Sequence, residues 1–378
     1  MKIVIAPDSF KESLSAEAVC EAIRSGIEQR LSDCDIVCVP VADGGEGTLD
    51  ALIAATGGQR FSASVMGPLP EMRVQADFGL LGDGSTAVIE MARASGLELL
   101  VPEQRDPGKT TTYGTGELIR AALDLGASQL IVAIGGSATN DGGAGMMQAL
   151  GMRFLDEHGY ELGYGGAQLS RLMKIDRSGL DPRLSQVSVV AACDVDNPLV
   201  GVNGASAVFG PQKGATAEMV TLLDNALGHY ANQIAQQLGA RVAEAPGAGA
   251  AGGMGAALLA FLDAELKPGI DIVTETVALK DLIQGADWVI TGEGRVDGQT
   301  LGGKTPAGVA KLAKSQGIPV VALAGSLGPG CEALEEVGIT ACFSVLNQPC
   351  SLPEALADGE KNLRLAAYQL AGLLEYLN

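Results

Sequence analysis

The sequence predicts an α/β protein of two domains, one of them a flavodoxin-like, doubly wound parallel sheet built from both chain ends. Short apolar runs alternate with helical patterns over the first 60 residues, and the same alternation returns near the C-terminus. Between these ends, polar and apolar residues alternate, which indicates antiparallel strands. We therefore expect a mixed α/β domain inserted into the doubly wound one.

The N-terminal region has the pattern of a βαβα unit. A first strand is expected at KIVIAP (2–7), followed by a helix over about 15–31. A second strand, DIVCVPV (35–41), precedes a helix over about 47–55. Such units give parallel strands joined by right-handed crossovers.

The C-terminal region repeats this pattern. Three strands are expected: ADWVITGEG (286–294), PVVALAGS (319–326) and ITACFSVLN (339–347). Helices are expected near 306–316 and 330–337, and a last helix over about 353–376 closes the chain.

The domain seams follow from where the pattern changes. Alternating residues with turn signals at GPLP (67–70) and GDGS (82–85) begin near residue 61. The expected domains are thus a discontinuous one of residues 1–60 and 275–378, and an inserted one of residues 61–274. Ligands of doubly wound sheets bind at the carboxyl ends of the strands, so we expect the active site in the cleft between the domains.

Composition excludes several classes of function. The formal charge of −20 argues against binding to nucleic acid or an anionic membrane surface. The seven cysteines form no CxxC pair and lie mostly in apolar runs, which is typical of reduced thiols in a cytoplasmic protein. The first strand starts too early for a cleaved signal, and the longest apolar stretch, 254–262, is too short to span a bilayer.

Residues 130–151 are the most informative segment. An apolar strand runs into the glycine-rich loop IGGSATNDGGAG (134–145) and then into a predicted helix, a pattern that offers backbone N–H groups and a helix N-terminus to an anion. Similar clusters recur at 42–48, 209–215, 246–255 and 291–305. In so acidic a chain, basic residues set among glycines are the candidate anion ligands: Lys11, Lys213, Arg295 and Lys304.

Two short motifs match nucleotide-binding patterns in a poor context. GQTLGGKT (298–305) fits the P-loop pattern, but GEGRVD separates it from the apolar run WVIT, and no later strand ends in a clear metal-binding aspartate. We still expect Lys304 to meet phosphate. GAGAAG (247–252) fits the dinucleotide pattern, but the preceding segment is a poor strand, which favours a helix start or a packing role.

Carboxylates rather than histidines are the expected acid–base groups. Only two histidines exist, His158 and His229, and both are expected to be structural or exposed, which removes a Ser-His-Asp hydrolase. Several acidic loop residues lie at predicted strand ends, which suggests Mg²⁺ binding and proton transfer. The acidic loop residues are Asp8, Asp43, Glu46, Asp141, Asp194, Asp196, Glu293 and Asp297.

Six blocks of the sequence resemble the class I glycerate kinase family of bacteria. They are PDSFKESLSA (7–16), VADGGEGT (41–48), IGGSATNDGGAG (134–145), CDVDNPL (193–199), FGPQKGA (209–215) and TGEGRVDGQTLGGKTP (291–306). The resemblance implies a cytoplasmic two-domain enzyme that phosphorylates D-glycerate with ATP and Mg²⁺. It implies 2-phosphoglycerate as the product, although the 3-phosphate has also been attributed to such enzymes.

Each role in phosphoryl transfer can be assigned to candidate residues of this sequence. Asp194 is the expected general base, with Asp8 as its rival, and Lys304 is the third catalytic candidate. The other assignments are Arg295, Lys11 and Ser9 for the substrate; Gly135, Gly136, Ser137, Lys213 and Gly303 for ATP; and Asp43, Glu46 and Glu293 for the metal.

Three alternatives stay open at this point. GAGAAG could serve an NAD-dependent dehydrogenase of a small hydroxy acid, and GQTLGGKT a P-loop-type kinase of another small metabolite. The glycine loops could also belong to a non-catalytic sensor of a small anion. The sequence leaves the adenine pocket open, and it neither requires nor excludes a homo-oligomer.

Overall fold

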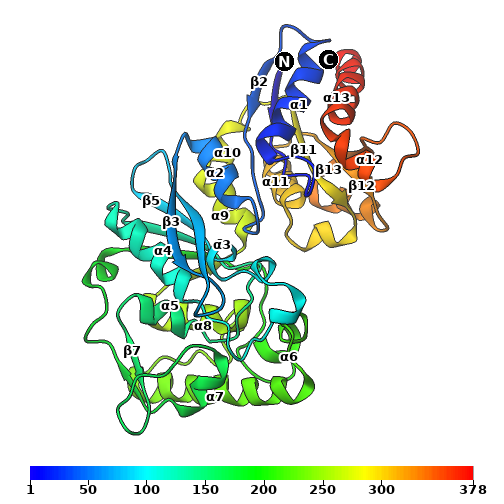
Figure 1. Ribbon diagram of the computed structural model, residues 1–378. Coiled ribbons are helices and arrows are strands. Elements are labelled where there is room, and N and C mark those ends of the chain that lie inside the picture. Colours follow the sequence, from blue (N-terminus) through cyan, green and yellow to red (C-terminus); the bar gives the residue numbers. More distant parts are fainter. Residues whose placement is uncertain (378) are drawn as a thin grey trace. The chain divides into compact units, whose positions relative to one another are not determined.

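The computed structural model describes residues 1–377 and divides the chain into two compact units. Unit 1 comprises Met1–Asp43, Asp50–Gly57 and the C-terminal segment from Ile270. Unit 2 comprises Gly44–Leu49 and Gly58–Gly269. Both chain ends belong to unit 1 (Figure 1). The chain is thus an α/β protein in which one unit is assembled from both ends of the sequence, as expected.

Unit 1 contains a five-stranded sheet in which every neighbouring pair is parallel. Its spatial order is β2-β1-β11-β12-β13, which is the flavodoxin-like order, and the switch point lies between β1 and β11. The strands are β1 (Lys2–Ile5), β2 (Asp35–Cys38), β11 (Trp288–Val296), β12 (Val320–Leu327) and β13 (Ile339–Ser344).

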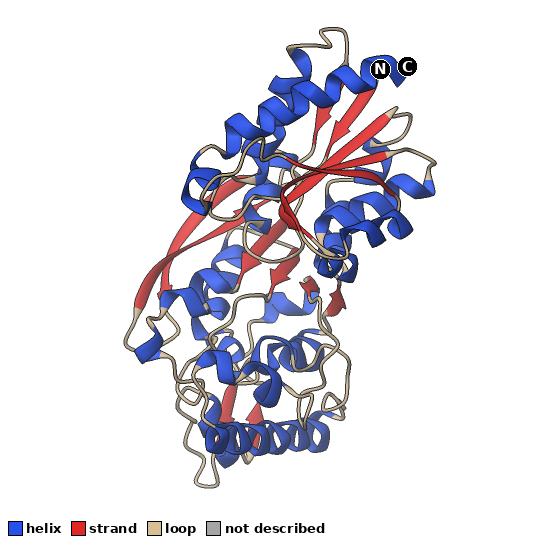
Figure 2. Ribbon diagram, turned by 90° about the vertical axis from the view of Figure 1, so that its right-hand side faces the viewer, coloured by secondary structure: helices blue, strands red, loops and turns tan. Residues whose placement is uncertain are grey.

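Helices cover both faces of this sheet (Figure 2). On one face α1 (Ala16–Glu28) and α13 (Gly359–Leu377) lie side by side, and their apolar residues share a buried core with Ile5, Ile290 and Leu323 of the strands. The other face carries α11 (Thr305–Ser315) against β11 and β12. Shorter helices complete the unit: α2 (Thr48–Thr56), α9 (Gly269–Thr276), α10 (Leu279–Leu282) and α12 (Leu352–Ala357).

Unit 2 contains a six-stranded mixed sheet of order β10-β9-β6-β5-β4-β3. The strands are β3 (Gln59–Met66), β4 (Arg73–Leu80), β5 (Thr86–Glu90), β6 (Gln129–Ala133), β9 (Ser188–Ala192) and β10 (Glu265–Lys267). The pairs β3–β4 and β4–β5 are antiparallel, as the alternating pattern predicts, and the remaining pairs are parallel. A separate antiparallel pair joins β7 (Arg153–Leu155) and β8 (Lys174–Asp176).

The helices of unit 2 bury a large apolar core against its sheet. They are α3 (Ala92–Ser95), α4 (Tyr113–Asp124), α5 (Ala144–Ala149), α6 (Ala205–Phe209), α7 (Ala217–Leu238) and α8 (Ala250–Leu262). In α8 the backbone leaves the helical region at 251–253, so the regular helix begins near Met254. Short 3₁₀ turns follow the chain at 97–99, 102–104, 166–171, 182–186 and 211–213.

Two C-terminal elements differ from the sequence prediction. Residues 331–337 form a 3₁₀ turn between two left-handed glycines, Gly330 and Gly338, rather than an α-helix. The predicted last helix is two helices that meet at Asp358, and the first of them starts with a capping box between Ser351 and Glu354. Within residues 1–377, none of the helices combines the length and apolar character needed to cross a bilayer.

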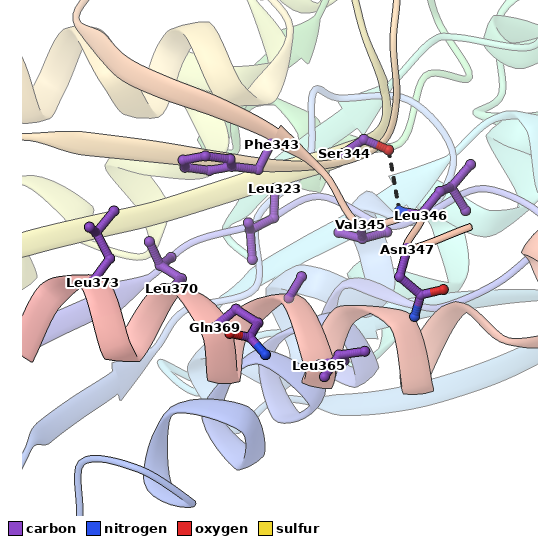
Figure 3. A pocket seen from close by; sticks show the side chains of 11 residues that line it. Leu323, Phe343, Ser344, Val345, Leu346, Asn347, Leu365, Gln369, Leu370 and Leu373 are labelled. Atoms are coloured by element: carbon purple, nitrogen blue, oxygen red, sulfur yellow. Dashed lines mark hydrogen bonds between the residues drawn. The ribbon is translucent and has the colours of Figure 1, made fainter. Parts of the chain in front are cut away.

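An apolar groove of about 410 Å³ lies between β13 and α13 in unit 1. Figure 3 shows Phe343 on one side and Leu370 and Leu373 on the other, with the Leu346 N–H donating to the Ser344 hydroxyl. The lining contains neither a carboxylate nor a cation, and it lies on the α13 face of the sheet. We therefore leave this groove outside the candidate functional site.

Candidate functional site

The switch point of unit 1 gathers carboxylates from three neighbouring strands. Asp8 follows β1, Asp43 follows β2 and Glu293 lies in β11. The three are close enough for the charge of Asp43 to raise the pKa values of both Asp8 and Glu293. This is the edge of a doubly wound sheet at which ligands bind.

Asp8 is held by hydroxyl and backbone donors. The Ser9 N–H donates to Asp8 Oδ1 at 2.6 Å, and the Ser9 hydroxyl adds a longer contact of 3.2 Å to the same atom. The Thr305 hydroxyl donates to Oδ2 at 2.5 Å. Burial and the nearby charge of Asp43 raise the pKa of Asp8 to about 6 despite these donors. The group is therefore ionised at neutral pH but remains a usable proton acceptor.

Glu293 is 9% exposed and points to the α11 face of the sheet. Its Oε1 accepts a hydrogen bond of 2.7 Å from the Thr300 hydroxyl, and its Oε2 lies 3.9 Å from Lys304 Nζ. Burial is the largest cause that raises the pKa of Glu293, to about 7, and Thr300 and Lys304 only partly offset it. Two neighbouring carboxylates thus carry more negative charge than their protein partners neutralise.

The glycine-rich segment after β11 connects this strand to α11. Strand β11 extends to Val296, two residues beyond the expected end at Gly294, so GEGRV belongs to the strand. Asp297 then caps a 3₁₀ turn over 298–302 and forms a capping box with Thr300. Gly303 has φ +108°, which favours glycine, and a side chain there would meet nothing within 4 Å. The segment is therefore open on its outer side.

Lys304 stands at the start of α11, where a helix offers unpaired N–H groups. Its side chain is 38% exposed, and its ammonium lies 3.9 Å from Glu293 Oε2. The hydroxyl of Thr305, the residue that ends the GKT pattern, is bound to Asp8. Lys304 can therefore reach a ligand while it stays next to the carboxylates.

The predicted substrate ligands lie on the same unit. Arg295, two residues after Glu293 in β11, is 64% exposed and pairs with Asp297 at 3.0 Å. Lys11 is exposed, and its backbone passes Gly294 so closely that a Cβ at Gly294 would lie 3.7 Å from Lys11 N. Ser9 contacts Asp8. The structure thus brings Asp8, Ser9, Lys11, Asp43, Glu293, Arg295, Gly303 and Lys304 together in unit 1.

The second anion-binding candidate, the loop after β6, lies in unit 2. Gly135 and Gly136 are exposed, whereas the residues that follow them are buried. Gly136 has φ +71°. The start of α5 is not offered to a ligand, because Asp141 already accepts the N–H groups of Gly143 and Gly145. Our expectation that this helix adds its N-terminus to the anion site is therefore wrong.

Lys213 lies beneath this loop rather than on it. It is 2% exposed, and its ammonium donates to the Ser137 hydroxyl and the Thr139 carbonyl, both at 2.7 Å. Burial lowers the pKa of Lys213 to about 7. The expected environment, a cation open to ATP, is corrected to a buried cation that fixes the loop from inside.

Asp194 also has a different environment from the one expected. It follows the buried strand β9, but its side chain is exposed, and its Oδ1 accepts the Gly269 N–H at 2.9 Å. Our expectation of a low local dielectric is therefore wrong. Asp194 lies in unit 2, whereas its rival Asp8 lies in unit 1.

The three predicted metal ligands belong to different units. Glu46 is exposed and belongs to unit 2, whereas Asp43 and Glu293 belong to unit 1. Over residues 1–377 the structure contains no cluster of three or more His, Cys, Asp or Glu side chains arranged to hold a metal ion. A cation at the switch point would therefore need oxygen ligands from a substrate as well.

Sequence reasoning missed the two threonines that orient the carboxylates. Thr300 and Thr305 are fully buried and donate to Glu293 and Asp8. A signal was present, since Asp297 and Thr300 have the spacing of a capping box.

The GAGAAG segment has a packing role, as its sequence context favours. Gly252 lies against the Thr139 carbonyl, and Gly249 against the Pro198 carbonyl, so protein backbone fills the space that a dinucleotide would need. Neither the dehydrogenase nor the P-loop alternative is supported.

Comparison with known proteins agrees with these observations. The sequence model of the "Glycerate kinase family" matches residues 3–375. The chain is 55% identical to glycerate 2-kinase of Escherichia coli strain K12 over 99% of this chain and 98% of that one. It is 54% identical to glycerate kinase of Bacillus subtilis strain 168, with coverage of 99% and 98%.

A solved structure gives the same result. A crystal structure described as a glycerate kinase 2 from Salmonella typhimurium LT2 superposes with a TM-score of 0.92 at 53% identity, and covers 100% of this chain and 98% of that one. At this identity and coverage both sequence and fold are shared. The chain belongs to the glycerate kinase family.

Proposed function

We propose that this protein transfers the γ-phosphoryl group of ATP to D-glycerate and releases 2-phosphoglycerate and ADP. One observation carries the proposal: a carboxylate with a pKa near 6, a second carboxylate and a lysine at a helix start meet at the switch point of a doubly wound sheet. Phosphoryl transfer needs a proton acceptor, charge neutralisation and positioning, and this cluster has groups for each. The names of the relatives supply the substrate and the position of the phosphate.

We assign the general base to Asp8. Its two carboxylate oxygens are fixed by Ser9 and Thr305, so the acceptor is held in one orientation. Its raised pKa brings its basicity closer to what proton abstraction from a hydroxyl requires than that of an ordinary aspartate. Asp194 is the competing assignment, and its exposed carboxylate is engaged with Gly269.

We assign Mg²⁺ to Glu293 and Asp43. Magnesium is commonly held by one or two carboxylates together with substrate phosphates, so this donor set fits the ion. Burial is the largest cause of the raised pKa values of Glu293 and Asp8, and the negative charge of Asp43 adds to it; a bound cation would offset that charge. When bound, Mg²⁺ supplies charge neutralisation to the phosphates. Glu46, on the other unit, is a weaker candidate.

We assign the phosphates of ATP to Lys304 and the N–H groups around Gly303, together with the Gly135–Ser137 loop. Lys304 would act on the group being transferred, because it stands next to Glu293. Lys213 would act indirectly, by holding Ser137 and Thr139 in place. The two loops lie in different units.

We assign the carboxylate of glycerate to Arg295, with Lys11 as second cation and Ser9 nearby. A guanidinium binds a carboxylate through two parallel hydrogen bonds, and Arg295 already binds Asp297. The carboxylate of glycerate would replace Asp297 as the partner of the Arg295 guanidinium. The seven free cysteines and the use of ATP fit a protein of the cytoplasm.

A coupled assay tests the function directly. Purified protein, D-glycerate and Mg·ATP are mixed with enolase, pyruvate kinase and lactate dehydrogenase, and NADH oxidation is followed. We expect signal without any mutase, since 2-phosphoglycerate is the substrate of enolase. Signal that appears only after phosphoglycerate mutase is added would mean the 3-phosphate. If no ADP forms with any hydroxy acid tested, the proposal fails.

A further inference from the structure

Two cysteines and an arginine form a cluster in unit 1 that the proposed reaction does not use. Cys20 lies on α1, and Cys38 is the last residue of β2, directly opposite Ile5 in the sheet register. The Cys20 thiol points to the Ile5 carbonyl at 3.7 Å, and the Cys38 thiol points to the Cys20 carbonyl at 3.8 Å. Both sulfur atoms therefore occupy the same small space between α1 and the end of β2.

Arg24 completes this cluster. It lies one helical turn after Cys20 on α1, so it covers the same side of the helix. Its guanidinium interacts with the Cys38 sulfur, and its salt bridge to Glu21 is long, at 3.5 Å. Its Nε atom is buried and has no hydrogen-bond acceptor among residues 1–377. A thiolate at Cys38 would supply the anionic acceptor that this donor lacks.

The two thiols of the cluster have pKa values shifted in opposite directions. The hydrogen bond with the Cys20 thiol, together with Arg24, lowers the pKa of Cys38 to about 7. The same hydrogen bond and deep burial raise the pKa of Cys20. At neutral pH a large fraction of Cys38 is therefore thiolate, and Cys20 keeps its proton. A cysteine with a lowered pKa next to a second cysteine is the arrangement of a thiol that is oxidised and then resolved.

Other thiols of the chain lack this environment. Burial raises the pKa of Cys193, and it raises the pKa of Cys342 to about 11. Burial also raises the pKa of Cys34. Cys38 is partly exposed, so a small oxidant can reach it, while Cys20 is 3% exposed.

We propose that Cys38 and Cys20 form an oxidation site, in which Cys38 is attacked by a hydroperoxide and Cys20 resolves the product as a disulfide. In the first step the Cys38 thiolate displaces hydroxide from the peroxide, which gives the sulfenic acid; with hydrogen peroxide, the hydroxide leaves as water after protonation. In the second step the Cys20 sulfur attacks the sulfenic sulfur of Cys38 and the S–O bond breaks. The leaving hydroxide takes the proton of the Cys20 thiol and departs as a second water, and the disulfide forms. The peroxide is reduced by two electrons, and the two thiols are oxidised by two.

The experiment uses the full chain and a mass readout. Reduced protein is treated with one to five equivalents of hydrogen peroxide, remaining thiols are alkylated, and peptides are mapped without reductant. We expect a Cys20–Cys38 linked peptide and the loss of two thiols per chain. The rate of loss should rise as the pH increases through 7, because the thiolate is the nucleophile.

Matched variants separate the two roles. Cys20→Ser should stop at the sulfenic acid on Cys38, which dimedone traps, and Cys38→Ser should abolish the fast reaction. Arg24→Gln should slow alkylation of Cys38 at pH 7 roughly three- to tenfold, the effect expected for a pKa rise of up to about one unit. Cys350→Ser, which removes an exposed thiol outside the cluster, should react like the wild type.

Two results would overturn the proposal. One is oxidation that starts at Cys350 or Cys331 while Cys38 stays reduced. The other is trapping of a sulfenic acid on Cys38 in the wild type as readily as in Cys20→Ser, since Cys20 would then not resolve it. Because every readout is a mass or a thiol count, the outcome does not depend on the proposed kinase activity. A circular dichroism spectrum of each variant separates misfolding from lost reactivity.

Discussion

The Thr305 hydroxyl donates a hydrogen bond to the carboxylate of Asp8, although 297 positions separate the two residues in the sequence. Asp8 follows the first strand, and Thr305 is the first residue of α11. The bond joins the proposed base to the start of the helix that carries Lys304. This hydrogen bond fixes the orientation of the Asp8 carboxylate and lowers the pKa of Asp8. Loss of the bond should therefore change both the orientation and the pKa of this carboxylate.

Asp8→Asn should lower kcat by about 10² or more with little change in the KM for ATP, because the amide keeps the shape but cannot accept the substrate proton. Steady-state kinetics with both substrates varied will measure this. Asp33→Asn, an exposed aspartate in the same unit, is the control. If Asp8→Asn keeps near-normal kcat while Asp194→Asn loses it, the base is Asp194.

Thr305→Val should shift the acid limb of the kcat/KM profile to higher pH. The limb reflects ionisation of Asp8, whose pKa is about 6, and the Thr305 hydrogen bond lowers that pKa. Removing the donor therefore raises the pKa, so more base is protonated at a given pH. Thr305→Ser keeps the hydroxyl and should retain the wild-type limb. Identical profiles for all three proteins would contradict the role of Asp8.

Glu293→Gln should stabilise the fold at pH 8 and abolish most activity. The folded-state pKa of Glu293, about 7, lies above its ordinary value of 4.5, so the folded protein pays for ionising this buried group. The penalty is absent below pH 4.5, grows as the pH rises and is complete above about 7. We expect a gain on the order of 3 kcal/mol in the free energy of unfolding at pH 8.

Urea titrations of Glu293→Gln at pH 8 and near pH 4.5 will check the sign. The gain should shrink to near zero at the lower pH, where the wild-type group is protonated in the folded state and about half protonated in the unfolded state. Glu335→Gln, on an exposed turn of the same unit, should change neither curve. A destabilised variant at pH 8 would mean that the contacts of Glu293 with Thr300 and Lys304 outweigh its desolvation.

Lys304→Ala should lower kcat/KM by one to several orders of magnitude, the scale expected when a positioned charge on a transferring phosphate is lost. Lys311→Ala, an exposed lysine further along α11, is the matched control. A Lys304→Ala enzyme within threefold of the wild type would mean that the GQTLGGKT segment is only a connection between β11 and α11.

Arg295→Lys should raise the KM for glycerate, since an ammonium cannot reproduce a bidentate guanidinium contact. The KM for ATP should stay close to its wild-type value, which distinguishes a substrate ligand from a general loss of structure. Kinetics at saturating ATP will measure the change. An unaltered KM for glycerate would remove Arg295 from the substrate site.

The strands of the doubly wound sheet were predictable because their apolar runs are short, buried and separated by helical patterns. The end of β11 was not predicted: the expected strand stops at Gly294, whereas β11 continues through Arg295 and Val296, which pair with Ser326 and Leu327 of β12. Within the strand, Gly292 packs so closely on the Leu323 carbonyl of β12 that a side chain would not fit. Glycine is required there by the approach of a neighbouring strand, and a single sequence does not reveal that neighbour.

The composition of the candidate site was predictable, but its contacts were not. Asp8, Glu293 and Lys304 could be selected because they stand at strand ends or among glycines. The burial of Lys213 could not be predicted, because lysine is almost never fully buried. Its two acceptors come from a loop more than 70 positions away in the sequence. The exposure of Asp194 likewise depends on tertiary structure, because its partner, Gly269, is distant in sequence.

The pairing of β1 with β11 also governs when this protein can fold during synthesis. The first strand leaves the ribosome early, but its central neighbour follows only after some 285 further residues. Until then β1, α1 and β2 can form only part of a sheet, with one edge of β1 unpaired. Such an edge can pair with other nascent chains.

Most of unit 2 is synthesised before β11, and the strands of unit 2 pair only with one another. Folding of the nascent chain should therefore begin in the middle of the sequence and finish at its ends.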